Sequence, residues 1–304
     1  MNNWINIPNV PRDERIGSAF NHLFQVINQT ENVQSDDLIW NFGGTTFFHP
    51  FFLAPLIIYK QRSEKSIKCQ GVPADIDRYF DLVHFHEPLL SDENMDLENM
   101  LSSYVHRSYI PVCRFDLCKS NVDALQTVLQ RVIERQCNAD SKITTPLSYF
   151  LGELICNMNQ HSHGKYGYIF SQYLNKRENS IDIILADDGI TVYGSYARTG
   201  KYLDKIGNND AEALRLANEG YSTKDLPESE NRGFGISTSK NMLVDGLKGS
   251  FFMLSGNAFH RYDVGSGSTF ISLPSNIYWH GTIILMRIPV NVPTGFNYLK
   301  YVVR

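Results

Sequence analysis

Two apolar segments, residues 165–174 and 180–186, are separated by the short polar turn 175–179. A connection this short favours an antiparallel pair of strands, because parallel strands need a crossover of about a dozen residues or more. Further strands are expected at residues 109–117, 251–255, 269–273 and 281–289. Helices are predicted at residues 122–136, 147–161, 209–220 and 237–245. This order predicts an α+β fold, with helices packed on one face of a sheet.

The N-terminal part of the chain has a different pattern. Predicted strands at residues 37–42 and 66–69 alternate with predicted helices at 51–59 and 75–82, which is typical of an α/β unit. An acidic run from Ser91 to Glu98 follows, and we interpret it as a solvated connection. The 304 residues exceed the roughly 100–200 of a single domain. We therefore expect a small α/β domain at residues 1–95, a linker at 96–110 and a second domain at 111–304.

Charge and hydropathy disfavour several classes of partner. The net charge is −4, and the sequence has no basic stripe of the kind that binds nucleic acid. The most apolar run, residues 45–59, contains His49, Pro50 and Pro55 and is too short for a membrane helix. The N-terminus lacks a secretion signal, and five scattered cysteines suit a reducing compartment. We therefore expect a cytoplasmic protein that binds neither nucleic acid nor membrane.

The predicted helix 147–161 carries a polar series on one face. Glu153, Asn157 and His161 are four residues apart, so their side chains project from the same side of the helix. An amide oxygen is a ligand that Mg²⁺ accepts, and a carboxylate can deprotonate a water molecule. The alternative interpretation of this series is a solvated helix face.

Three glycine-containing segments follow. The apolar strand ending at Ala186 leads into Asp187-Asp188-Gly189, where an aspartate can accept a hydrogen bond from a ligand amine; a plain turn is the alternative. Residues 232–237, Arg-Gly-Phe-Gly-Ile-Ser, place two glycines at a helix N-terminus, which can bind phosphate. Gly281-Thr282 opens the last strand.

In order and spacing these four segments resemble the GHKL ATPase superfamily, which includes DNA gyrase B, heat-shock chaperones, histidine kinases and MutL. The resemblance covers about residues 105–290. The series from Glu153 to His161 resembles the family's N box, and Asp187-x-Gly189 resembles the box that reads adenine. Gly233-x-Gly235 resembles the glycine box under the phosphates. The resemblance implies a two-layer α/β sandwich of the Bergerat type that binds ATP with Mg²⁺.

Site roles carried over from the family follow the matching positions. Glu153 would be the general base and Asn157 the Mg²⁺ ligand. Asp187 would accept from the adenine amine and Thr282 would support the adenine water network. A lid is expected at residues 192–232. The remaining residues expected at the ATP site are Gly189, Thr191, Lys224, Arg232, Gly233, Phe234, Gly235 and Ile236.

Three details qualify these roles. Lys224 and Arg232 are candidates to contact phosphate, with ordinary surface basic residues as the alternative. His161 is interpreted as a packing or capping residue within the N box. Thr191 stands where the family usually has a second glycine, which predicts a stiffer lid hinge or a different lid path.

The N-terminal pattern is similar to STAS domains, the fold of anti-anti-sigma factors. The strand at residues 37–42, the segment 46–53, the strand at 67–69 and the helix at 75–83 carry this likeness. Phe51 or Phe52 stands near the expected position of the serine that becomes phosphorylated in such domains. This domain could not be phosphorylated there and would act as a scaffold or docking surface. Another small α/β domain is the alternative.

Three functions are compatible with these features. The first is an ATPase that switches conformation to regulate a partner protein. The second is a serine kinase of the anti-sigma-factor type that acts on a separate STAS-domain partner. The third is an ATP-gated interaction module without catalysis. The sequence identifies no partner, and a homodimer stays open.

Overall fold

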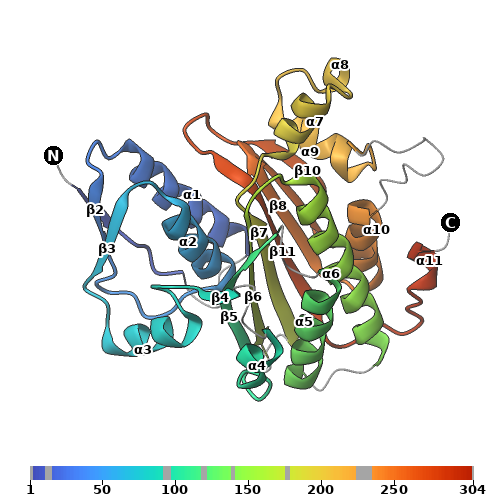
Figure 1. Cartoon of the computed structure of the whole chain (residues 1–304), viewed down its shortest axis with the longest axis horizontal. Coiled ribbons are helices and arrows are strands. Elements are labelled where there is room, and N and C mark those ends of the chain that lie inside the picture. The colour runs from blue at the N-terminus through green and yellow to red at the C-terminus, as the bar shows by residue number, and fades with distance from the viewer. Residues whose placement is uncertain are drawn as a thin grey trace. The chain divides into compact units, whose positions relative to one another are not determined.

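The computed structural model describes residues 3–10, 16–91, 97–117, 122–137, 141–174, 179–223 and 235–302. The chain falls into two compact units, Met1–Leu89 and Leu90–Arg304 (Figure 1). Both units contain helices and strands, so the chain is a mixed α/β protein. Among the described residues, no helix combines the length and the apolar character needed to cross a membrane.

The second unit begins earlier than the sequence predicts. Strand β4 (Leu89–Ser91) forms one edge of its sheet, and helix α4 (Leu97–Ser102) follows. Strand β5 (Tyr109–Asp116) then starts inside the expected linker 96–110. A strand of three residues beside an acidic run has no alternation that a sequence pattern can detect, which explains the difference.

The first unit is built on a three-stranded parallel sheet in the order β1-β2-β3. The predicted strands at 37–42 and 66–69 and helices at 51–59 and 75–82 are confirmed, whereas β1 and α1 were not predicted. The elements of this unit are β1 (Trp4–Asn6), α1 (Ile16–Asn32), β2 (Asp37–Asn41), α2 (Pro50–Arg62), β3 (Ser66–Gln70) and α3 (Ala74–Val83).

Helix α2 forms the core of the first unit. Its start is fixed by His49, whose ring Nδ1 accepts a hydrogen bond from the backbone N–H of Phe51 at 3.2 Å, and by Pro50 at the first helical position. The first ten residues of α2 are all buried, including Phe51 and Phe52. Both phenylalanines near the expected serine position therefore pack inside the unit and are not on its surface.

The second unit contains an eight-stranded sheet in the order β10-β9-β8-β11-β7-β6-β5-β4. The predicted antiparallel pair is confirmed as β6 and β7, with Tyr168 opposite Ala186. Strand β9 was not predicted; it pairs with β8 through the turn Gly256-Asn257, where Gly256 has φ 62°. The remaining bounds are β6 (Tyr166–Leu174), β7 (Ser180–Asp187), β8 (Ser250–Gly256), β9 (Ala258–Asp263), β10 (Gly267–Ser272) and β11 (Trp279–Pro289).

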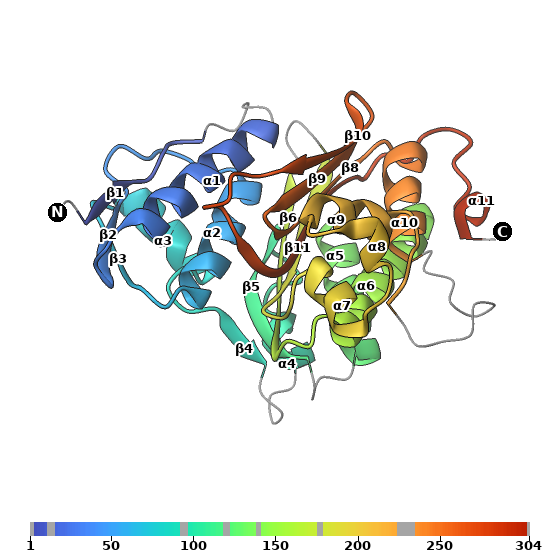
Figure 2. The same ribbon diagram turned by 90° about the horizontal axis from the view of Figure 1, so that it is seen from above.

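Three helices cover one face of this sheet: α5 (Val122–Cys137), α6 (Ser141–His161) and α10 (Gly235–Asn241) (Figures 1 and 2). A π-helical turn, Met242–Gly246, continues α10. The sequence predicts that Pro146 opens α6, but the helix starts at Ser141 and Pro146 lies in its second turn. Proline removes one helical hydrogen bond there, and the helix continues past it.

The segment after β7, expected to be irregular from residue 187 to 207, contains two short helices. These are α7 (Val192–Thr199) and α8 (Leu203–Ile206), and α9 (Asp210–Asn218) follows at the predicted position. Helix α9 contacts β8, β9 and β10. The small helix α11 (Leu299–Val302) contacts α10.

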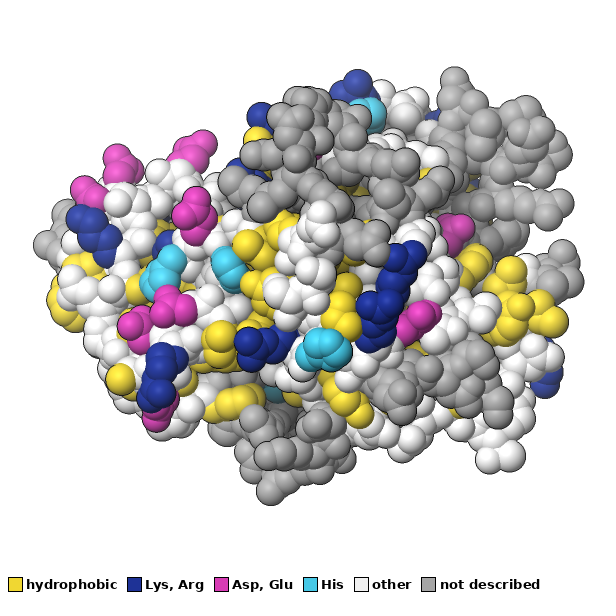
Figure 3. All heavy atoms as spheres, turned by 60° about the horizontal axis from the view of Figure 1, so that its bottom comes forward, with side chains coloured by type: hydrophobic (Ala, Val, Ile, Leu, Met, Phe, Trp, Pro, Cys, Tyr) yellow, Lys and Arg dark blue, Asp and Glu magenta, His cyan; other side chains and the backbone are white. Residues whose placement is uncertain are grey.

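Charged side chains are mixed on the surface. On the face drawn in Figure 3, the described Lys and Arg side chains lie among acidic and uncharged ones and form no continuous stripe.

A buried ion pair joins the two central strands. Asp182 on β7 lies directly opposite Arg287 on β11. The guanidinium donates two hydrogen bonds to the carboxylate, from Nε to Oδ1 and from Nη2 to Oδ2, each at 2.7 Å. Asp182 is completely buried. Because a buried carboxylate is costly without a partner, this pair fixes the register of β7 against β11.

Replacing Arg287 with Met should lower the free energy of unfolding by about 3–5 kcal/mol, because the Asp182 carboxylate stays buried without its cation. Urea denaturation measures the effect. As a control, Arg215→Met breaks half-exposed pairs with Glu212 and Glu219 and should cost at most about 1 kcal/mol. Equal losses in the two variants would contradict a special role for the buried pair.

Candidate functional site

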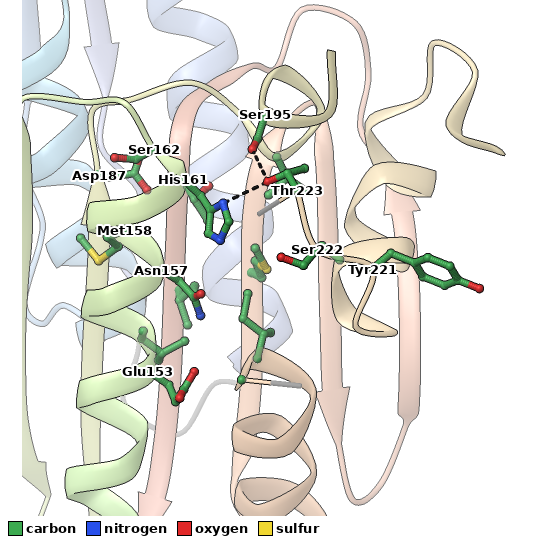
Figure 4. A pocket seen from close by; sticks show the side chains of 18 of the residues that line it. Glu153, Asn157, Met158, His161, Ser162, Asp187, Ser195, Tyr221, Ser222 and Thr223 are labelled. Carbon is green, nitrogen blue, oxygen red and sulfur yellow. Dashed lines mark hydrogen bonds between the residues drawn. The ribbon is translucent and has the colours of Figure 1, made fainter. Parts of the chain in front are cut away.

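A pocket of about 430 Å³ lies in the second unit between α6 on one side and α7 and α10 on the other. The end of β7, residues of β8, β11 and α11, and the segment 221–223 also line it. Figure 4 shows polar side chains from several of these elements around it. This volume suits a small-molecule ligand, for which pockets of about 300–1,000 Å³ are usual.

One wall is a single face of α6. Tyr149, Glu153, Asn157 and His161 all line the pocket and follow each other at intervals of four residues. Leu151 and Ile155, on the opposite side, are completely buried. Figure 4 shows Glu153, Asn157 and His161 in succession along the helix. The predicted polar series therefore faces a cavity and not bulk solvent.

Tyr149 extends this series and was not predicted. Its hydroxyl hydrogen-bonds Thr238 of α10, and burial followed by the nearby Glu153 carboxylate raises the pKa of Tyr149. Tyr149 and Thr238 both line the pocket beside Glu153. The four-residue spacing alone would have identified Tyr149.

Gly235, the first residue of α10, packs against the Glu153 side chain. A side-chain carbon at Gly235 would overlap the Glu153 carboxylate and lie 3.5 Å from Asn157 Nδ2. In this arrangement glycine leaves room for the Glu153 carboxylate, and a larger residue would require that flexible side chain to move. The lower end of the pocket combines a carboxylate, an amide and a helix start.

At the other end, Asp187 is the last residue of β7 and is buried. Its Oδ1 accepts a hydrogen bond from the backbone N–H of Gly189 at 2.9 Å. A side-chain carbon at Gly281, which has φ 73°, would overlap the Asp187 backbone and lie 2.6 Å from Asp187 Oδ1. One at Gly189 would overlap the carbonyl oxygen of Ser162. Two glycines thus allow neighbouring backbone to enclose this carboxylate.

The adjacent carboxylate has a different role. Asp188 Oδ1 accepts hydrogen bonds from the backbone N–H groups of Lys165 at 2.8 Å and Tyr166 at 2.7 Å. Asp188 therefore fixes the start of β6, and it does not line the pocket. Of the two aspartates in the predicted turn, only Asp187 borders the cavity.

Ser255 on β8 forms hydrogen bonds with two other segments, the start of α7 and the Gly281-Thr282 segment of β11. Its hydroxyl donates to the Gly281 carbonyl oxygen at 2.8 Å and accepts from the Val192 N–H at 2.9 Å. The hydroxyl oxygen of Thr282 lies 3.3 Å from it. No sequence pattern identified Ser255, because its partners come from distant segments.

Thr191 is the N-cap of α7. Its hydroxyl accepts the N–H of Gly194 at 3.0 Å, and the residue is buried in the pocket wall. This capping hydrogen bond gives a physical reason for threonine where the family resemblance expects glycine. The described part of the expected lid, residues 192–223, contains α7, α8 and α9 packed around Tyr196, Ile206, Ala213 and Leu216.

His161 makes a contact that the sequence did not predict. Its Nδ1 lies 3.0 Å from the Thr223 hydroxyl, which lies 2.9 Å from the Ser195 hydroxyl (Figure 4). All three side chains line the pocket. Because 62 residues separate His161 from Thr223, no local pattern could have predicted this contact.

The predicted site residues divide into three groups. Gly189 does not line the pocket, but its backbone N–H donates a hydrogen bond to Asp187. Lys224, Arg232, Gly233 and Phe234 lie outside the described residues. The residues that line the pocket are Glu153, Asn157, Asp187, Thr191, Gly235, Ile236 and Thr282.

Lys240 on α10 points away from the pocket. Its ammonium is buried, donates to the Asn218 carbonyl oxygen at 3.4 Å and has its pKa lowered by burial to about 8. His260 on β9 is also buried, and burial lowers its pKa to about 4. Neither residue lines the pocket. The described part of the chain holds no group of three or more His, Cys, Asp or Glu side chains arranged to bind a metal ion.

Comparison of the chain with models of protein families, with curated proteins and with solved structures found no match. The function of the pocket therefore has to be inferred from its own geometry.

Replacing Gly189 with Ala should lower the free energy of unfolding by about 1–3 kcal/mol or more, because the new methyl group meets the rigid Ser162 carbonyl. Thermal denaturation measures this loss. Gly265→Ala is the control: its new carbon has Asp263 Oδ1 as nearest neighbour at 3.4 Å. That variant should stay within about 0.5 kcal/mol of the wild type. If Gly189→Ala is as stable as the wild type, the backbone of Gly189 does not pack closely against the Ser162 carbonyl.

Proposed function

We propose that the second unit binds ATP with Mg²⁺ and hydrolyses it slowly, as a nucleotide-dependent switch that regulates a partner protein. The observation that carries the proposal is the pocket itself. It has an enclosed carboxylate, Asp187, at one end and the pair Glu153 and Asn157 against Gly235 at the other. The proposal takes the roles of these groups from the resemblance of the sequence to GHKL ATPases.

The Asp187 end suits an adenine ring. The carboxylate accepts hydrogen bonds, as the 6-amino group of adenine requires, and one of its oxygens is oriented by Gly189. Apolar side chains beside it offer surfaces for a flat ring, and the Thr282 hydroxyl can hold a bridging water. These apolar residues include Met158, Ile190, Met253 and Ile284.

The opposite end suits phosphates with a magnesium ion. The Asn157 amide oxygen is a hard ligand of the kind that Mg²⁺ accepts. Mg²⁺ usually takes few protein ligands and completes its shell with phosphate and water. Bound there, Mg²⁺ would neutralise charge on the phosphates.

Glu153 is the residue that would be needed for hydrolysis of ATP but not for its binding. Its carboxylate can orient a water molecule and accept its proton as the water attacks the terminal phosphate. The close packing of Gly235 and the nearby Tyr149 restrict where this carboxylate can lie. A restricted position favours catalysis, because the base is already placed when the substrate arrives.

Glu153→Ala should lower ATP turnover by about 10²–10⁴-fold while ATP affinity changes little, because a general base acts on the chemical step. Steady-state phosphate release measures turnover, and calorimetric titration measures affinity. Glu134→Ala, on α5 and outside the pocket lining, is the matched control and should turn over ATP normally. If Glu153→Ala retains full turnover, Glu153 has no part in the mechanism.

Asp187→Asn should weaken ATP binding by about 1.5–3 kcal/mol, the contribution of a hydrogen bond to a charged group. Calorimetric titration with and without Mg²⁺ gives the affinities. Asp188→Asn changes the adjacent aspartate, which does not line the pocket, and should bind ATP like the wild type. Undiminished affinity in Asp187→Asn would remove the adenine assignment.

A further inference from the structure

Three side chains from separate segments form a continuous hydrogen-bonded series across the pocket wall. We call Ser195, Thr223 and His161 the hydroxyl chain. Ser195 Oγ lies 2.9 Å from Thr223 Oγ1, and Thr223 Oγ1 lies 3.0 Å from His161 Nδ1 (Figure 4). The three residues come from α7, the segment after α9 and the end of α6. None of these three residues has been given a role in the ATP site proposed above.

Figure 4 shows His161 between Asn157 and Asp187 along the pocket, with Thr223 and Ser195 near the level of Asp187. Along α6, His161 is about 6 Å beyond Asn157 and about 12 Å beyond Glu153, given the rise of an α-helix. Ser162, the next residue, contacts Gly189 in the turn that follows Asp187. In a nucleotide, the sugar joins the base to the phosphates. A nucleotide with its base at Asp187 and its phosphates at Asn157 therefore has its sugar near His161.

The two hydroxyls retain hydrogen-bonding capacity. Each can donate once and accept twice. Among the described residues, the Ser195 side chain makes one hydrogen bond and the Thr223 side chain makes two. Ser195 is only 8% exposed, yet it lines the cavity. A buried hydroxyl with unused capacity on a pocket wall is suited to a ligand that both donates and accepts.

We propose that the hydroxyl chain recognises the ribose hydroxyls of the bound nucleotide and so selects ribonucleotides over deoxyribonucleotides. The proposal rests on the ATP site proposed above and adds a specificity determinant to it. Each ribose hydroxyl donates and accepts, so it can extend the chain whichever nitrogen of His161 carries the proton. Hydrogen bonds in series polarise one another, which strengthens the contact at the end of the chain.

The test compares the affinities of ATP, 2′-deoxy-ATP and 3′-deoxy-ATP for the full chain by calorimetric titration. Wild-type protein should bind ATP more tightly than at least one deoxy analogue, by roughly two- to tenfold, the effect of one neutral hydrogen bond. Thr223→Val keeps the shape of the side chain but removes the hydroxyl, and should bring this ratio close to one. Ser195→Ala removes one end of the chain and should reduce the ratio independently.

Thr199→Ala is the matched control. Thr199 is also on α7, but its hydroxyl bonds the Ser195 and Tyr196 carbonyls of its own helix, and it does not line the pocket. This variant should keep the wild-type ratio. Equal affinities of the wild type for all three nucleotides would overturn the ribose assignment and leave the ATP site standing. Equal weakening of all three by Thr223→Val would show that the chain only holds the walls together. Failure of all three to bind would overturn both proposals.

Discussion

The position of β7 at the centre of the larger sheet is the constraint on which the pocket depends. The strand pairs with β6 on one side and β11 on the other, and all eight of its residues are buried. A slip of one residue would reverse the direction of every side chain and would separate Asp182 from Arg287. Because the register is fixed, the carboxylate of Asp187 has one position, at the end of the strand.

Three close contacts at glycine then bring the walls of the pocket together. Gly189 lies against the end of α6, Gly281 against Asp187, and Gly235 against Glu153. At each position an added carbon would overlap a neighbouring atom. At Gly189 and Gly281 the overlapping atom is backbone, whereas at Gly235 it belongs to the Glu153 side chain.

Local periodicity explains what the sequence could reveal about this site. Glu153, Asn157 and His161 could be assigned to one wall because helical spacing depends only on neighbouring residues. Tyr149 has the same spacing and lines the same wall, although it was not predicted as a site residue. Pro146 suggested a helix start because proline is common there, although α6 begins five residues earlier.

Such local patterns cannot predict contacts between segments that are distant in the sequence. Ser195 meets Thr223 across 28 residues and Ser255 meets Val192 across 63. The roles of these hydroxyls appear only once the sheet and helices are assembled. Short elements were also not predicted. The eight residues of α7 have no long apolar period, so the sequence indicated an irregular segment there although Thr191 is a good N-cap. The strand β9 was missed although Gly256-Asn257 is a hairpin signal.

The described charges around the pocket bear on the proposed binding of a nucleotide together with a metal ion. Glu153 and Asp187 line it, whereas no Lys or Arg among the described residues does. Lys240, on the helix that begins at the pocket, is instead buried against the Asn218 carbonyl. A polyphosphate entering beside a carboxylate is repelled unless a cation lies between them. Asn157 is one helical turn from Glu153, so a cation bound at its amide oxygen would lie where this repulsion is greatest.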